Sequence, residues 1–183
     1  MQTKYVSFMD ELQSHFPGLS EGKLTDISDY NVIWSLDEYL AAGHVNFNTD
    51  RKELYRLSIL IESYAARNKE PLLATFETAK RYKYVEDRYV ELLEKIPKAW
   101  IVGNFDNPYL APNTSENAEV LSCDGTSISD MWIVATNGKN GPFGLVAEDI
   151  GNGRYRGFFT ISPQIMHKAI DLINQMLRAK ISL

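Results

Sequence analysis

Three apolar runs in the second half of the chain are separated by short turn-forming segments, and this spacing restricts the possible fold more than any other feature. The runs lie near residues 131–136, 143–149 and 154–160. They are joined by the segments 137–141 and 151–153, which are rich in Gly and Asn. Both residue types accept the positive φ that tight hairpin turns demand. We therefore expect an antiparallel meander.

The segment before the meander alternates between strand-like and helical patterns. A short buried strand is expected over residues 71–76, and a second strand is expected over 98–103. The helix between them ends at Pro97 and carries its apolar side chains on one face: Val85, Tyr89, Leu92, Leu93 and Ile96. Strand, helix and strand at this spacing predict a right-handed crossover and a parallel pair of strands. A further short strand is expected at 120–121.

Two other helices have recognisable start signals. Asp50, with Glu53 three residues later, forms a plausible capping arrangement ahead of an apolar stripe that includes Leu54, Leu57 and Ile61. Ser162 is a suitable cap for the last helix, and Pro163 fits its first position. These helices are expected to cover the sheet.

The first 48 residues are expected to form a helical extension. One helical pattern ends at Pro17-Gly18, and a second one ends near Gly43. The aromatic residues here favour packing on the main domain or on a second subunit. The sequence thus predicts an α+β fold with a mixed sheet of five or six strands, a βαβ start, an antiparallel meander and flanking helices. It divides into an extension at 1–48 and a main domain at 49–183.

Composition excludes several classes of protein. The 183 residues carry a formal net charge of −5 and have no basic run, which argues against nucleic-acid binding because phosphate contacts need clustered Lys and Arg. The single cysteine, Cys123, allows no intramolecular disulfide and fits a reducing compartment. No stretch approaches the ~20 apolar residues that span a bilayer. We expect a cytoplasmic protein without membrane insertion.

Residues ~50–178 resemble the DICT domain, a sensory domain named for its association with diguanylate cyclases and two-component systems. The similarity lies in an ordered set of segments: Leu73-Ala74-Thr75-Phe76-Glu77, Trp100-Ile101-Val102-Gly103, Asp130-Met131-Trp132-Ile133-Val134, Gly144-Leu145-Val146-Ala147-Glu148, and Tyr155-Arg156-Gly157-Phe158-Phe159-Thr160 before Ser162-Pro163. The order and spacing of these segments are similar throughout, whereas the first 48 residues lie outside the resemblance.

The resemblance implies a regulatory input module of bacterial signal transduction, often found in photosynthetic bacteria beside light-sensing and cyclic-dinucleotide signalling domains. We expect a non-enzymatic protein that needs no cofactor and acts through contact with a protein partner in a signalling pathway. A homodimer is also plausible. The alternative is a module that binds a small ligand, either a nucleotide or another anion.

Four residues are candidates for that ligand site. Arg154 and Arg156 alternate with Tyr155 and should share one side of the sheet, where two guanidinium groups can clamp a phosphate or carboxylate. Phe158 would lie on the same face and offer a stacking surface. Glu148 and Asp149 lie across the turn, however, and cross-strand pairing with the arginines is the favoured interpretation. Asp106 follows a strand end and can hold a ligand hydroxyl, although Asx-Pro segments more often form turns.

The remaining polar residues give weaker signals. Glu77 and the segment Lys80-Arg81-Tyr82-Lys83 lie at a strand-to-helix connection, where the local positive charge can meet an acidic partner or simply be solvated. The three histidines, His15, His44 and His167, lie in separate segments and indicate no metal site. No Ser/His/Asp set can be assembled.

Overall fold

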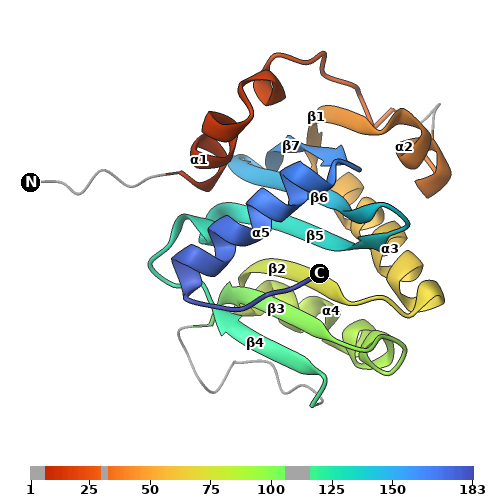
Figure 1. Cartoon of the computed structure of the whole chain (residues 1–183), viewed down its shortest axis with the longest axis vertical. Helices are drawn as coiled ribbons and strands as arrows, with labels where there is room; N and C mark the ends of the chain where they lie inside the picture. Colours follow the sequence, from red (N-terminus) through yellow and green to blue (C-terminus); the bar gives the residue numbers. More distant parts are fainter. Residues whose placement is uncertain (1–6, 30–32, 106–115) are drawn as a thin grey trace, which may run out of the picture.

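The computed structural model describes residues 7–29, 33–105 and 116–183, and these form a single mixed sheet with helices on both faces (Figure 1). The sheet has seven strands in the order β1-β7-β6-β5-β2-β3-β4. The strands are β1 (His44–Asp50), β2 (Leu72–Thr78), β3 (Ala99–Asn104), β4 (Ala118–Ser122), β5 (Met131–Gly138), β6 (Gly141–Gly151) and β7 (Arg154–Thr160). The helices are α1 (Phe8–His15), α2 (Leu36–Ala42), α3 (Arg51–Asn68), α4 (Ala79–Leu93) and α5 (Pro163–Leu177), with short 3-10 turns at Pro17–Ser20 and Ser127–Asp130.

The two faces of the sheet have separate hydrophobic cores. Helix α5 crosses the near face in Figure 1, whereas α3 and α4 lie behind the sheet. The core under α5 also receives Phe8, Met9 and Leu12 from α1. The core under α3 and α4 includes Tyr39 from α2. Because each strand alternates its side chains between the two faces, residue parity decides which core a strand residue enters.

The predicted α+β class, the crossover and the meander are confirmed. β2 and β3 pair in parallel through α4, and β4 pairs in parallel with β3. β5, β6 and β7 pair antiparallel in sequence. In the turn between β6 and β7, Gly151, Asn152 and Gly153 all have positive φ, with values of 91°, 56° and 71°. The expected turn chemistry is therefore present.

The structure departs from the expected N-terminal helical extension at the C-terminal end of that segment. Residues 44–50 form the edge strand β1, which pairs antiparallel with β7 and raises the strand count to seven. Val45, Phe47 and Thr49 alternate inward, but the intervening His and Asn residues have low strand propensity and conceal the pattern. The helices α1 and α2 pack on the domain itself, which is one of the two arrangements that the sequence indicated.

Helices α3 and α4 begin at the same edge of the sheet. β1 and β2 run in the same direction, since four antiparallel pairings separate them, and each leads directly into a helix. Asp50 caps α3 by accepting from the Glu53 backbone N–H at 3.0 Å, as predicted. Thr78 caps α4 by accepting from the Arg81 backbone N–H at 3.3 Å. The first turns of both helices therefore flank one region.

In the described part of the chain, no helix combines the length and apolar character needed to cross a membrane.

Candidate functional site

A cleft of about 1100 Å³ lies between α3 and α4, above strands β2 and β5. Its floor is formed by the carboxyl end of β2, from Thr75 to Thr78, together with Trp132 and Val134 of β5. Its walls are residues of the two helices, including Tyr55 and Tyr84. Ligands of open α/β sheets bind outside the carboxyl ends of strands, which is the position of this cleft.

The cleft lies where β2 leaves its neighbour β5. The pairing between these strands runs from Leu72 to Ala74 and stops there. Beyond it, the Thr75 hydroxyl takes the place of the backbone ladder, accepting from Ile133 N–H at 2.8 Å and donating to the Met131 carbonyl at 3.0 Å. A register shift against β3 follows between Phe76 and Thr78. Such irregularities re-aim side chains, and here the re-aimed side chain is that of Glu77.

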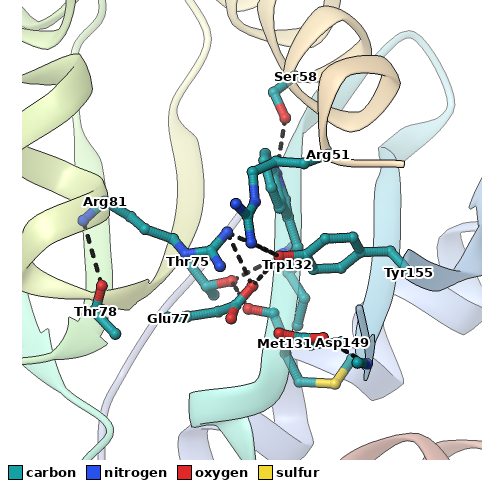
Figure 2. A network of polar contacts seen from close by, with 12 residues as sticks. Arg51, Ser58, Thr75, Glu77, Thr78, Arg81, Met131, Trp132, Asp149 and Tyr155 are labelled. Atoms are coloured by element: carbon teal, nitrogen blue, oxygen red, sulfur yellow. Dashed lines mark hydrogen bonds and ion pairs between the residues drawn. The ribbon is translucent and has the colours of Figure 1, made fainter. Parts of the chain in front are cut away.

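Glu77 belongs to a polar network that joins four elements (Figure 2). The Tyr155 hydroxyl of β7 donates to Glu77 Oε1 at 2.8 Å. The same hydroxyl accepts from Arg81 of α4 at 2.8 Å and from Arg51 of α3 at 3.4 Å. Arg81 also lies 3.5 Å from the Glu77 carboxylate. Two arginines from two helix starts therefore converge on one tyrosine oxygen and one carboxylate.

The electrostatics of Glu77 are unusual for a carboxyl group. Burial raises the pKa of Glu77 to about 7, and the neighbouring Asp149 carboxyl also raises it. The Tyr155 hydroxyl and the Arg81 guanidinium act in the opposite direction, because both stabilise the charged form. Glu77 therefore changes its charge near neutral pH, inside a cleft lined by cations.

A second buried carboxylate lies deeper between the helices. Glu62 of α3 is 2% exposed and accepts from the Tyr89 hydroxyl of α4 at 2.6 Å. Arg88 of α4 forms an ion pair with the other Glu62 oxygen. The Arg88 guanidinium also lies over the Tyr55 ring, 5.2 Å from its centroid. Burial raises the pKa of Glu62, whereas Arg88 and Tyr89 oppose that rise. This contact fixes α4 against α3.

The cleft is positively charged although the whole chain is acidic. Two of its lining residues are acidic, Glu62 and Glu77, and both have basic partners. Six are basic: Arg51, Lys52, Lys80, Arg81, Lys83 and Arg88. The complete chain has 19 basic and 24 acidic residues. An excess of cations in a concave site raises the local concentration of anions.

The three sequence-predicted ligand residues that the structure describes, Arg154, Arg156 and Phe158, do not line this cleft. Arg156 pairs with Glu148 at 3.0 Å, directly across the β6–β7 ladder, which is the cross-strand interpretation that the sequence favoured. Arg154 donates to the Asn48 carbonyl and side-chain oxygens, both at 3.0 Å. Phe158 is only 2% exposed and stacks on His44, so its ring offers no open surface. Asp106 lies outside the described residues.

The residues that build the cleft were only partly visible in the sequence. The segment 80–83, whose positive charge the sequence shows, forms the start of α4 rather than a solvated loop. Lys80, Arg81 and Lys83 line the cleft, while Tyr82 is buried. Tyr155 contacts Glu77 across 78 positions of the sequence, a separation at which no local pattern acts. A Lys/Arg-rich first turn of α4 without acidic residues is the sequence signal from which this cleft could have been found.

Other candidate chemistries find little support in the described residues. No group of three or more His, Cys, Asp or Glu side chains is arranged to hold a metal ion there. Cys123 is buried, and its sulfur lies 3.7 Å from the Ser129 hydroxyl. Burial raises the pKa of Cys123, which disfavours the reactive thiolate.

Comparison with protein-family models and with curated proteins finds no match. One solved structure is similar, the polyphosphate kinase from Porphyromonas gingivalis, with 13% sequence identity and a TM-score of 0.44. The alignment covers 70% of this chain and 22% of the kinase chain. So distant a likeness establishes neither a shared fold nor a shared activity.

Proposed function

We propose that this protein is a non-enzymatic regulatory domain that binds a small anionic ligand in the cleft between α3 and α4. The observation that carries the proposal is the charge of the cleft: six Lys and Arg residues surround a space of about 1100 Å³ in a chain with a net charge of −5. A ligand with phosphate or carboxylate groups matches this environment, because guanidinium groups bind such oxygens in a planar, directed way.

The convergence of Arg51 and Arg81 supports binding at the mouth of the cleft. Both guanidinium groups already point at one oxygen, that of Tyr155 (Figure 2). Preorganised donors of this kind bind an anion without a large ordering cost. Lys80 lies next to Arg81 and is exposed, so it can contact a ligand that approaches from solvent.

The regulatory part of the proposal rests on the resemblance to DICT domains. A ligand that contacts both α3 and α4 has a direct way to change the relation between the two helices, and a partner protein can read that change. We place this role in the cytoplasm, in a bacterial signalling pathway of the type that the resemblance implies, linked to light or cyclic-dinucleotide signalling.

Titration calorimetry with inorganic pyrophosphate tests the anion site. We expect saturable binding that weakens as NaCl is raised, because added salt screens exposed charges. Lys80→Ala should reduce the affinity several-fold, whereas Lys95→Ala, which removes an exposed cation outside the cleft lining, should not. No binding at low salt, or equal effects of both substitutions, would overturn the proposal. Conversion of pyrophosphate to phosphate would contradict the non-enzymatic assignment.

A second candidate function is that of an adaptor that binds a protein partner or a second copy of itself. Ile33 is 74% exposed and Leu24 is 56% exposed, both in the N-terminal region outside the DICT resemblance. Apolar side chains of this size and exposure are available for burial at a protein interface. Native mass spectrometry of the protein isolated from its own cells tests the adaptor function. A second polypeptide at fixed ratio or a homodimer supports it. A bare monomer contradicts it.

A further inference from the structure

The first turns of α3 and α4 carry the same residue pattern. On α3, Arg51 and Lys52 are followed by Tyr55, and on α4, Lys80 and Arg81 are followed by Tyr84. In both helices two adjacent cations thus precede a tyrosine by three and four positions. Residues four apart lie on one face of a helix and are separated by about one turn, ~5.4 Å along its axis. Each helix therefore offers a cationic end and, one turn later, an aromatic ring.

The two tyrosines meet across the cleft. The ring centroids of Tyr55 and Tyr84 are 6.5 Å apart, and the rings are inclined at 69°. Tyr55 is half-buried, and its ring is held by the Arg88 guanidinium. Tyr84 is 84% exposed although it lines the cleft. A large aromatic ring in this position has a free surface next to the cations.

We infer that the ligand of this cleft carries a phosphate group and a planar ring on one molecule, as a nucleotide does. This inference rests on the proposed anion-binding function and narrows its ligand class. The phosphate lies at the cationic first turns, near Arg51, Lys80 and Arg81. The ring stacks on Tyr84, whose Cα lies one helical turn further along α4.

The walls of the cleft agree with this ligand, and its volume is just above the usual range for such sites. Pockets for small molecules and cofactors occupy ~300–1,000 Å³ and combine apolar or aromatic walls with a few polar groups. Here the space is about 1100 Å³, and the half-buried rings of Phe76 and Trp132 supply apolar surface between the cations. A simple inorganic anion would use the cationic end and leave this surface empty.

Stacking on a tyrosine gives affinity without strict base selection, because every base has a π-face. Two polar side chains of the cleft wall are already engaged and do not select a base: Ser58 accepts from Trp132 Nε1 at 2.9 Å, and Glu62 is bound by Arg88 and Tyr89. Adenine and guanine nucleotides are therefore expected to bind with similar affinity.

Calorimetric titrations of the full chain with ADP, pyrophosphate and adenosine test the inference. We expect ADP to bind about tenfold more tightly than pyrophosphate, since the stacked base adds to the diphosphate contacts. Tyr84→Ala should remove this advantage and leave the pyrophosphate affinity unchanged, while Tyr84→Phe should keep it. Because Tyr84 is so exposed, these substitutions should not disturb the fold, and Val90→Ala on the same helix serves as the matched control.

The outcomes separate this inference from the proposed function. Equal affinities for ADP and pyrophosphate, unaffected by Tyr84→Ala, would overturn the ring subsite and leave the anion site standing. Binding of adenosine as tightly as ADP would overturn the phosphate-plus-ring assignment. Failure of every probe to bind would overturn the inference and the proposed function together.

Discussion

At the scale of single residues, Glu77 is the most informative group in the molecule. A carboxyl group whose pKa is raised by burial makes the folded state bind a proton that the unfolded chain releases. Folding stability therefore falls as the pH rises from the ordinary value of 4.5 to the folded value of about 7. Allowing for partial solvent screening, this loss amounts to about 2 kcal/mol.

Glu77→Gln should remove this loss. The amide oxygen still accepts from Tyr155, and the uncharged side chain has no burial cost of ionisation. We expect the variant to be about 2 kcal/mol more stable than the wild type at pH 8, with the difference vanishing near pH 4.5. Urea unfolding at several pH values measures it. Glu119→Gln, at a carboxyl that is half exposed, is the matched control. If the free energy of unfolding depends on pH in the same way in the wild type and in Glu77→Gln, the assignment is contradicted.

The roles of single residues were predictable from the sequence where their partners are close in sequence. The caps at Asp50 and Ser162 and the cross-strand partner of Arg156 follow from neighbours in sequence or across one short turn. The Glu77–Tyr155 contact and the burial of Phe158 depend on how helices cover the sheet, and residue alternation alone carries no such information.

At the scale of elements, α3 and α4 are joined through Glu62. Removing one partner of a buried ion pair costs more than the pair contributes, because a buried charge is left without compensation. Arg88→Met should therefore destabilise the protein by roughly 2–4 kcal/mol, since Glu62 would keep only Tyr89 as a partner. Urea unfolding measures the loss.

The double variant Glu62→Gln/Arg88→Met is the control for that prediction. It removes both charges and keeps an acceptor for the Tyr89 hydroxyl, so it should recover most of the lost stability. If the stability losses of the single variants Glu62→Gln and Arg88→Met add up to the loss of the double variant, the ion pair does not couple the helices.

Among the elements, β1 shows why part of the fold escaped prediction. Its core-facing residues Val45, Phe47 and Thr49 have the period of a strand, but the segment follows the helix α2 directly and is rich in Asn. Its partner β7 lies more than 100 positions away, and that pairing decides its structure. The meander was predictable because all its partners are neighbours in sequence.

At the scale of the whole molecule, the basic residues considered as ligand contacts lie in two regions on opposite faces of the sheet. Arg154 and Arg156 alternate with Tyr155, which points to the cleft side, and they are engaged by Asn48 and Glu148. The cleft cations belong to helices on the other face. Sequence reasoning identified two arginines as candidates but could not see that helices α3 and α4 bring six cations together.

The substitution pair Arg154→Ala/Arg156→Ala separates the two regions. Because Arg154 and Arg156 are exposed, their loss should cost no more than about 1 kcal/mol of stability. Pyrophosphate affinity should stay within twofold of wild type, as measured by calorimetry. A large loss of pyrophosphate affinity in a variant whose circular dichroism spectrum shows a retained fold would indicate that the ligand binds at β7 instead.

The most direct test of the account is an amide NMR titration of the isotope-labelled chain with pyrophosphate. The account predicts that the shifted amides cluster at Arg51–Tyr55 and Lys80–Tyr84, the first turns of α3 and α4. Shifts centred on Arg154 to Phe158, or no shifts at saturating pyrophosphate, would contradict it.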